Sequence, residues 1–324
     1  MLGNYRDALG DAFVRIGEEF KDLVVVTADV SKSTQSIRFK ERYPDRFFSV
    51  GIAEQNAVGT AAGIATFGIP VIFTAYAMFA TEKPFEQIRN MIAYPRLNVK
   101  IVATHGGINV GEDGVTHQAI EDIAIMRAIP GMTVVVVADP GEVTPALRAV
   151  VRHPGPVYLR LPRAASEIIH PDGSRVDFPI GKAETLREGT DVALLGVGMM
   201  VSECLRAAES LARDGIQARV INIRTVKPLD EETVVAAARE TGAIVTAEDH
   251  NCHGGLGGAV AEMLVARHPV PMEQVALRDT FARSGEGRLL MEKYCLTSQE
   301  IYTRAFVALK RKIADKEGKH SATA

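Results

Sequence analysis

The sequence predicts an α/β protein with two doubly wound domains, each built on a mainly parallel sheet. Short runs of β-branched residues are apolar at consecutive positions, which is typical of strands buried on both faces. Segments with helical spacing of apolar residues alternate with these runs, and this alternation favours right-handed crossovers onto a parallel sheet. The alternation stops once, in a polar stretch rich in proline and glycine, and then restarts.

The first domain is expected over residues 1–165. Its predicted strands are LVVVTA near 23, VIFT near 71, VKIVAT near 99 and TVVVV near 133. The predicted helices include AEQNAVGTAAGIATF and ATEKPFEQIRNMIA. Residues 166–190 lack a sustained apolar period and contain two Pro and Gly pairs, so we expect a linker there with room for a hairpin.

The second, smaller domain is expected over residues 191–314. Its strands are predicted at DVALLGVG, QARVINI, AIVTAE and QVALRD. Its helices are predicted up to about 213 and near 231–241, 259–267 and 298–313. Residues 315–324 (DKEGKHSATA) have almost nothing to bury and are expected to be disordered.

Composition excludes several classes of function. The 37 Lys and Arg against 40 Asp and Glu give a formal charge of -3, so the chain has no general field that would attract nucleic acid or an anionic membrane. Its three cysteines have no CxxC spacing, which argues against a disulfide framework and a thiolate zinc site. The longest apolar run, VALLGVGMMV, is about half a membrane span. We therefore expect a cytoplasmic protein.

Two glycine motifs follow predicted strands of the second domain. Gly196 and Gly198 stand where a dinucleotide fingerprint would begin, but Val201 holds its third glycine position and no acidic residue follows the next strand. A tight strand-to-helix turn is the better interpretation. GGLGG at 254–258 also misses the fingerprint spacing, so we interpret it as a turn or an interface loop, with His253 structural.

A glycine-rich loop, THGGINVGEDGVTH, follows the strand near 99, where parallel sheets place their binding sites. A metal site of His105, Asp113 and His117 is conceivable, but their spacing matches no known helical ligand pair. We favour polar groups that project into a cleft, with glycines that let backbone and ligand approach closely.

Three charged residues have ordinary explanations when each is taken alone. Glu54 begins an apolar helix, where a carboxylate meets the helix dipole favourably. Arg6 and Arg163 lie at opposite ends of the first domain's sequence, and lone arginines are usually solvated surface charges.

Taken together, several motifs resemble a known family. TADVSKS (27–33), GIAEQN (51–56), FTAYAMF (73–79), THGGINVGEDGVTHQ (104–118) and LRLPR (159–163) resemble, in order and spacing, the pyrimidine-binding domain of transketolases. VINIRTVKPLDEET and EDHNCHGGLGGAV resemble the family's C-terminal domain, so the resemblance extends to about residue 313.

The resemblance implies half of an enzyme. Full-length transketolases also have an N-terminal domain whose GDG motif binds the Mg²⁺ and diphosphate of thiamine diphosphate, and this chain contains no GDG. The resemblance therefore implies the small subunit (C-terminal section) of a two-chain transketolase. A separate N-terminal subunit would supply the diphosphate site and bind most of the Mg²⁺, in an α2β2 heterotetramer, and this chain itself would hold no metal.

The resemblance also implies roles for individual residues. The family's glutamate at Glu54 hydrogen-bonds a pyrimidine nitrogen of the cofactor and supports proton transfer, which makes Glu54 catalytic. The cofactor-binding residues would be Asp29, Val30, Glu54, Tyr76 and Phe79, whereas Glu82 replaces a family aromatic residue. The substrate-binding residues would be Arg6, Ser33, His105 and Arg163 for the sugar phosphate, with Asp113 and the second catalytic residue, His117, near the reacting carbons.

The implied activity is the transfer of a two-carbon ketol unit from a ketose phosphate to an aldose, as in the pentose phosphate pathway. Two related activities are alternatives. The β subunits of 2-oxo acid dehydrogenases lack the THxxxxxGEDGxTH loop, and 1-deoxyxylulose-5-phosphate synthases typically have an acidic residue at His105 and form one long chain. A non-catalytic regulatory partner is the third alternative, but Glu54 and both arginines are present.

Overall fold

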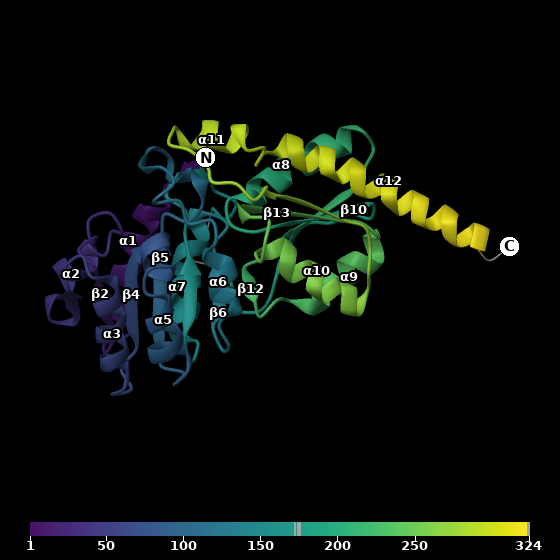
Figure 1. The fold of residues 1–324 in the computed structure, drawn as a ribbon. Helices are drawn as coiled ribbons and strands as arrows, with labels where there is room; N and C mark the ends of the chain where they lie inside the picture. Colours follow the sequence, from purple (N-terminus) through teal and green to yellow (C-terminus); the bar gives the residue numbers. More distant parts are fainter. Residues whose placement is uncertain (172, 174–175, 323–324) are drawn as a thin grey trace.

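The structure is a computed structural model that describes residues 1–171, 173 and 176–322. Two α/β domains lie side by side, with the N-terminal one at the left of Figure 1. This confirms the fold class predicted from the sequence. No helix among the described residues is long and apolar enough to cross a membrane.

The first domain is built on a seven-stranded sheet of order β12-β6-β7-β5-β4-β2-β3. All neighbours except the β12–β6 pair are parallel. The strands that the domain itself contributes are β2 (Val24–Thr27), β3 (Phe47–Ser49), β4 (Val71–Tyr76), β5 (Val99–Thr104), β6 (Thr133–Val136) and β7 (Val157–Arg160). The four predicted strands are present, β3 and β7 are additional strands of the same domain, and β12 is the seventh strand of the sheet.

Helices cover both faces of this sheet, as consecutive apolar residues in its strands require. Val25, Ile72 and Val102 pack with α1 (Tyr5–Glu19) and α7 (Val143–Arg152) on one face. The alternate strand residues pack on the other face with α3 (Glu54–Ala65) and α6 (Asp122–Ala128). The remaining short helices are α2 (Ile37–Arg42), η1 (Pro44–Arg46), η3 (Ile108–Asp113) and η4 (Pro140–Glu142).

One predicted helix is broken in the structure. The segment ATEKPFEQIRNMIA, expected as a single helix, is divided among α4 (Ala77–Thr81), α5 (Phe85–Gln87) and the π-helical η2 (Ile88–Ala93). The interruption falls at Pro84, because proline has no N–H to donate and disfavours the helical conformation of the residue before it.

The second domain has a five-stranded sheet of order β14-β13-β10-β11-β9, parallel except at β9. Its strands are β9 (Glu184–Arg187), β10 (Val192–Gly196), β11 (Ala218–Asn222), β13 (Ile244–Asn251) and β14 (Met272–Leu277). Its helices are α8 (Met200–Arg213), α9 (Glu231–Thr241), α10 (Leu256–Arg267), α11 (Gly287–Lys293) and α12 (Ser298–Ala322). Gly198, with φ of 60°, makes the tight turn between β10 and α8.

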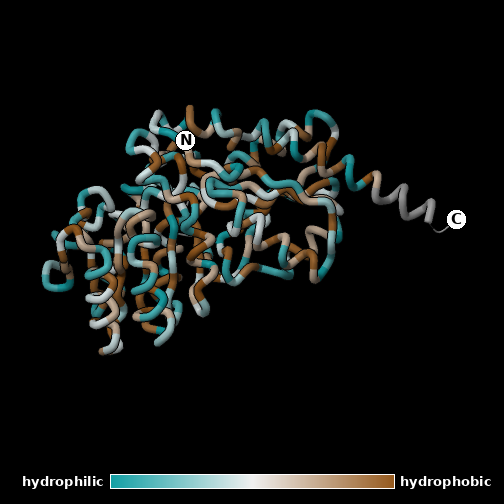
Figure 2. The backbone as a smooth tube through the Cα atoms, in the orientation of Figure 1, coloured by the Kyte–Doolittle hydropathy of each residue, from teal (hydrophilic) through white to brown (hydrophobic). Residues whose placement is uncertain are grey.

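The two domains are joined more closely than the sequence indicates. Strand β12 (Thr225–Lys227) follows β11 in the chain, yet it pairs antiparallel with β6 at the edge of the first sheet. One apolar cluster contains residues from both sheets, such as Ile101 and Leu195. Figure 2 shows hydrophobic stretches along the interior segments of both domains.

Two expectations about the connecting and terminal segments need correction. No hairpin forms among the described residues of 166–190: β8 (Ser166–Glu167) pairs with β1 (Leu2–Gly3), and β9 joins the second sheet. Helix α12 continues to Ala322, so most of the tail expected to be disordered is helical. Alanine, lysine and glutamate in this segment are good helix formers, and helix propensity does not require a buried face.

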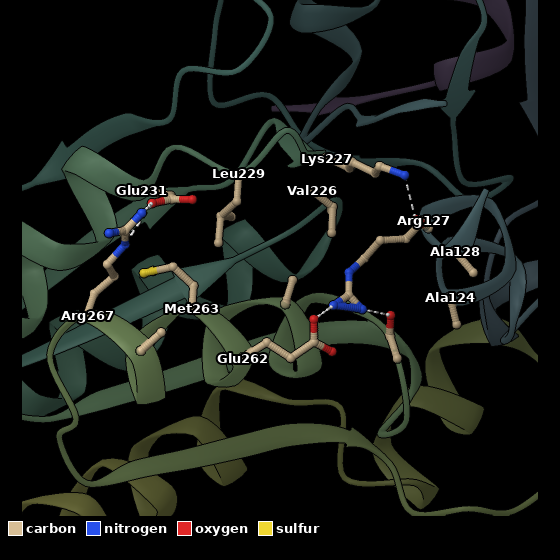
Figure 3. Close-up of a pocket in the computed structure, with 13 residues that line it drawn as sticks. Ala124, Arg127, Ala128, Val226, Lys227, Leu229, Glu231, Glu262, Met263 and Arg267 are labelled. Carbon is tan, nitrogen blue, oxygen red and sulfur yellow. Dashed lines mark hydrogen bonds and ion pairs between the residues drawn. The ribbon is translucent and has the colours of Figure 1, made fainter. Parts of the chain in front are cut away.

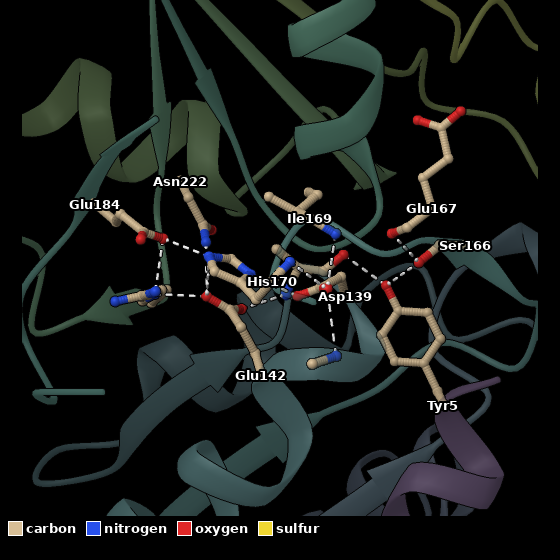
Figure 4. Close-up of polar contacts among 12 residues, drawn as sticks. Tyr5, Asp139, Glu142, Ser166, Glu167, Ile169, His170, Glu184 and Asn222 are labelled. Atoms are coloured by element: carbon tan, nitrogen blue, oxygen red, sulfur yellow. Dashed lines mark hydrogen bonds and ion pairs between the residues drawn. The ribbon is translucent and has the colours of Figure 1, made fainter. Parts of the chain in front are cut away.

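A buried ionic network crosses the domain boundary (Figure 4). The His170 imidazole lies between two carboxylates, with Nδ1 2.7 Å from Asp139 Oδ1 and Nε2 2.9 Å from Glu184 Oε2. Arg224 of the second domain donates to Glu142 and Glu184, at 2.6 Å each. Burial alone would lower the pKa of His170, but its hydrogen bonds to Asp139 and Glu184 raise this pKa to about 10. His170 is therefore protonated at neutral pH.

We expect the stability of the protein to fall at alkaline pH because of His170. A folded pKa of about 10, above the ordinary 6.5, means that its contribution is fully present below about pH 6.5 and is lost as the pH rises through about 10. We expect His170→Asn to be less stable by about 3 kcal/mol at pH 7, the scale for breaking a buried ion pair. Chemical denaturation should show this gap closing toward about pH 10.5. A gap that stays constant over this range would contradict the assignment.

Candidate active site

Candidate site residues gather where the parallel strands of the first sheet end. Asp29 follows β2, Tyr76 ends β4, His105 follows β5 and Arg163 follows β7. Because β2, β4, β5 and β7 are neighbours in one parallel sheet, these residues share its carboxyl edge. This is the edge at which open α/β sheets bind ligands.

Four aromatic side chains form one group, called here the ring cluster: Tyr76, Phe79, His105 and His117. The Tyr76 ring centroid lies 4.0 Å from that of His105 and 6.2 Å from that of Phe79. His117 meets Phe79 edge-on at 5.1 Å. Tyr76, Phe79 and His117 remain partly exposed, so the cluster presents ring surface to a ligand.

Glu54 lies beside the ring cluster. Glu54 is 5% exposed, and its carboxylate accepts a 2.6 Å hydrogen bond from Lys83 Nζ. The same ammonium is 5.9 Å from the centre of the Phe79 ring. Among the described residues, the Glu54 carboxylate is hydrogen-bonded to Lys83 and not to the first amides of α3, so it does not cap the helix by hydrogen bonding. Lys83, which sequence reasoning missed, is half-exposed on a flexible stem and can move aside.

His105 is a buried, neutral base. Its backbone has φ of 64°, an uncommon conformation for a residue with a side chain. Burial lowers its pKa, and the nearby positive charges of Arg163 and Arg6 lower it further, to about 3. Its Nδ1 lies 2.7 Å from Thr104 Oγ1. The imidazole therefore offers a hydrogen bond without a charge.

The structure brings both arginines to this edge. Arg163 Nη1 donates to the carbonyl of Val110 and lies 3.3 Å from Asp113 Oδ2. Arg6 lies in the first turn of α1, and its buried Nε has no hydrogen-bond partner among the described residues. The positive charges of both arginines lower the pKa of His105.

Three predicted site residues are less closely connected. Asp29, Val30 and Ser33 lie in the loop after β2, and Asp29 is exposed with φ of 62°. Val30 packs against the core. No hydrogen bond or ion pair of the described residues joins Asp29 or Ser33 to the ring cluster.

The expected role of the loop glycines needs correction. A Cβ at Gly107, where φ is 85°, would overlap the carboxylate of Asp249 in the second domain. A Cβ at Gly106 would lie 2.6 Å from Arg160 Nε. These glycines are therefore required by close packing within the chain rather than by the approach of a ligand.

Glu82 has an unusual environment. Burial raises its pKa to about 8, with help from the neighbouring carboxylates of Glu121 and Asp122. At neutral pH it is therefore largely a neutral carboxylic acid. Glu82 replaces an aromatic residue of the family, and its neutral form can still line a pocket from which water is excluded.

His105, Asp113 and His117 are not grouped with metal-ligand geometry: among the described residues, the group with such geometry is Asp139, Glu142 and His170. That group belongs to the ionic network of Figure 4, in which the two ring nitrogens of His170 lie against Asp139 and Glu184.

A separate hollow of about 740 Å³ lies between the domains, lined by α6 and α10 (Figure 3). Its charged residues already have partners. Arg127 pairs with Glu262, and Arg267 pairs with Glu231 at 3.1 Å. The carboxyl edge of the first sheet is the better candidate site, because it has partly exposed rings and an Arg6 Nε that lacks a hydrogen-bond partner within the described part of the chain.

Comparisons with known proteins agree with this fold and site. Residues 3–167 match the transketolase pyrimidine-binding domain, and residues 181–301 match the transketolase C-terminal domain. These two domains define a chain of the thiamine-diphosphate enzyme class. The chain belongs to the transketolase family, which confirms the resemblance found in its sequence.

Similar proteins include split and single-chain enzymes. A "Putative transketolase C-terminal section" of Methanocaldococcus jannaschii is 43% identical, covering 94% of this chain and 96% of that protein. A 6-deoxy-6-sulfo-D-fructose transketolase subunit of Clostridium sp. is 41% identical over 95% of each chain. A 1-deoxy-D-xylulose-5-phosphate synthase of Desulforudis audaxviator is 38% identical, and the match spans 48% of it. The solved structure "Split gene transketolase, inactive beta4 tetramer" has a TM-score of 0.87 and 42% identity, covering 95% of this chain and 99% of that one.

Proposed function

We propose that this chain is the small subunit of a two-chain, thiamine-diphosphate-dependent transketolase, which moves a two-carbon ketol unit from a ketose phosphate to an aldose. The observation that carries the proposal is the arrangement at one sheet edge. A buried carboxylate, Glu54, lies beside the ring cluster, Arg163 contacts the loop that carries His105 and His117, and the charges of Arg163 and Arg6 both act on His105. This arrangement fits a flat cofactor ring next to a polar substrate with an anionic end.

The residues fit the pyrimidine half of the cofactor. Glu54 is buried, and its partner Lys83 is half-exposed, so the carboxylate would exchange that partner for a ring nitrogen. Phe79 and Tyr76 supply aromatic surface for the flat ring. Asp29 and Val30 would support the cofactor near its thiazolium ring. When bound, thiamine diphosphate supplies a nucleophilic carbon and an electron sink, and the protein supplies orientation and proton transfer.

The remaining predicted residues would hold the substrate. Arg6 and Arg163 would bind the phosphate, because guanidinium groups match its oxygens with charge-assisted hydrogen bonds. Ser33 and neutral His105 would add uncharged hydrogen bonds. Asp113 and His117, at the end of the loop, would contact hydroxyl groups near the reacting carbons, and His117 would relay a proton there. Arg163 would exchange its contact with Asp113 for the phosphate.

We infer that a partner subunit completes the site. The chain contains no GDG motif, so an N-terminal subunit would bind the diphosphate and Mg²⁺, with α2β2 as the expected assembly. Its similarity to the C-terminal section of a transketolase and to a split-gene β tetramer described as inactive supports this inference.

The donor preference of the assembled enzyme tests the proposal. We expect Arg163→Ala and Arg6→Ala each to weaken the apparent affinity for a ketose phosphate by roughly 10- to 150-fold, because each variant loses charge-assisted hydrogen bonds of about 1.5 to 3 kcal/mol. Turnover of hydroxypyruvate, a donor without phosphate, should stay within a few fold of wild type. Steady-state kinetics with both donors measures the difference.

Arg288→Ala is a matched control, because Arg288 is exposed on α11 and, as far as the structure describes the chain, pairs only with Glu292 of the same helix. It should leave both donors unaffected. Equal losses with both donors in the Arg6 and Arg163 variants would assign these arginines to the fold or the subunit interface. No loss with either donor would point to a substrate without phosphate, as in a 2-oxo acid enzyme.

A further inference from the structure

The loop that contains His105, Asp113 and His117 is held by the second domain as well as by its own. This segment, residues 105–118, is called here the histidine loop. Its Ile108 is fully buried in the apolar core of the second domain, where it packs with Leu290 and Met291 of α11. Figure 1 shows α11 lying at the upper end of the first domain, near the N-terminus.

Polar contacts from the segment before α11 complete this attachment. Gln118 Nε2 donates to the carbonyl of Arg283 at 3.0 Å, and Ser284 Oγ donates to the carbonyl of Glu112. A Cβ at Gly111 would lie 3.2 Å from the carbonyl oxygen of Gly285. The loop is therefore packed between the two domains along most of its length.

One carboxylate of the second domain makes the most specific contacts. Asp249 of β13 is 3% exposed, and its Oδ1 accepts a 3.0 Å hydrogen bond from the backbone N–H of Ile108. Its Oδ2 accepts a 2.8 Å hydrogen bond from the side-chain amide of Asn109. The Asp249 backbone is held in turn, because its carbonyl accepts from Arg160 Nη2 at 2.9 Å.

The contact continues from Asn109 to the substrate arginine. The Asn109 side-chain oxygen accepts from the backbone N–H groups of Arg163 and Ala164, at 3.3 Å and 3.4 Å. The Asp249 carboxylate accepts a hydrogen bond from the NH₂ group of the same Asn109 side chain. It therefore fixes the orientation of that amide. Asp249 thus orders two segments at once: the histidine loop and the residues at Arg163.

We propose that Asp249 is a positioning residue of the active site, through which the C-terminal domain sets the placement of the histidine loop and Arg163 relative to substrate. This inference rests on the proposed function for its substrate, a ketose phosphate. Asp249 does not touch the substrate itself. It acts through Ile108 and Asn109, whose positions decide where His105 and the Arg163 guanidinium lie.

Asp249→Asn is the sharpest test, because it keeps the shape of the side chain. One oxygen becomes an NH₂ group that faces a donor, either the Ile108 N–H or the Asn109 amide, so one hydrogen bond is lost. We expect kcat/KM for a ketose phosphate in the assembled enzyme to fall by about 10- to 100-fold, mainly through KM. Hydrogen exchange should accelerate by a similar factor at the group that loses its bond, which is either the Ile108 backbone N–H or the Asn109 side-chain amide.

The double variant Asp249→Asn with Asn109→Asp exchanges the two groups. The amide at 249 can then accept from the Ile108 N–H and donate to the carboxylate at 109, whose other oxygen still accepts from the Arg163 backbone. We expect kcat/KM to recover to within about threefold of wild type. If Asp249 only stabilised the fold, the double variant would not recover activity.

Glu142→Gln is the matched control. Glu142 is also a buried interdomain carboxylate, which accepts from Asn222 Nδ2 at 2.9 Å and from Arg224, but it is not bonded to the histidine loop. It should lower stability without changing KM or the exchange of residues 105–118. Equal changes in Glu142→Gln and Asp249→Asn, or unchanged exchange in Asp249→Asn, would overturn the inference. If the wild-type complex showed no ketol transfer, the proposed function would be refuted. The hydrogen-exchange result would still test whether Asp249 positions the histidine loop.

Discussion

The purified chain by itself should catalyse no measurable ketol transfer, and activity should appear when a subunit with a GDG motif is added. The proposed site accounts for the pyrimidine side of the cofactor only, through Glu54, Phe79 and Tyr76. Half a cofactor site binds weakly and lacks the diphosphate and Mg²⁺ ligands that orient the reacting carbon. The assay mixes the chain, thiamine diphosphate, Mg²⁺, xylulose 5-phosphate and ribose 5-phosphate, with and without the partner.

Two controls make this result interpretable. Circular dichroism and size-exclusion chromatography should show that the isolated chain is folded, because its apolar clusters are continuous and one of them is shared by both domains. A partner whose GDG aspartate is changed to alanine should bind the chain without restoring turnover. Robust turnover by the chain alone would refute the two-chain proposal.

Glu54→Gln should reduce turnover of the assembled enzyme by about 10²- to 10⁴-fold, which corresponds to roughly 3 to 5 kcal/mol. The amide keeps the size of the side chain but cannot exchange a proton with a pyrimidine nitrogen. Stability should barely change, because the ion pair that is lost involves Lys83, a half-exposed residue. Single-turnover kinetics and thermal unfolding of the same preparation measure the two effects.

Lys83→Met separates the two roles of Glu54. This variant also removes the ion pair, but it retains the carboxylate and the apolar stem, so turnover should stay within a few fold of wild type. If Glu54→Gln kept near-normal turnover while its melting temperature fell, Glu54 would be a structural residue. If both variants lost turnover equally, the ion pair and not the free carboxylate would be the functional unit.

Much of the fold could be predicted because its signals are local. Consecutive apolar residues predicted β2, β4, β5 and β6, and the restart of the alternation after the linker predicted the second sheet. Strand β12 has three residues and follows β11 closely, so no local pattern separates it or indicates that it pairs with β6. The break at Pro84 was readable from the sequence, yet the apolar spacing around it favoured a continuous helix.

For the candidate site, the sequence predicted the residues but not their contacts with the second domain. The motifs placed Tyr76 and Phe79 on one segment and His105 and His117 on another, and the structure brings the four rings together. The glycines of the loop suggested an approach by a ligand, whereas the structure shows the second domain packed against them. Asp249 lies in a buried strand between other polar residues, where no pattern distinguishes a residue that contacts the loop.

The sequence by itself determined the order of the strands and helices, the two-domain organisation and the family, because apolar periodicity and motif spacing are written along the chain. Only the tertiary structure decided which charges are partnered. The Lys83–Glu54 pair joins residues 29 positions apart, and the contact of Asp249 with Ile108 joins residues 141 positions apart. Hydrogen bonds and burial depend on distances in space, and a separation of that length leaves no trace in local sequence. The environment that makes His105 neutral and His170 charged therefore exists only in the folded protein.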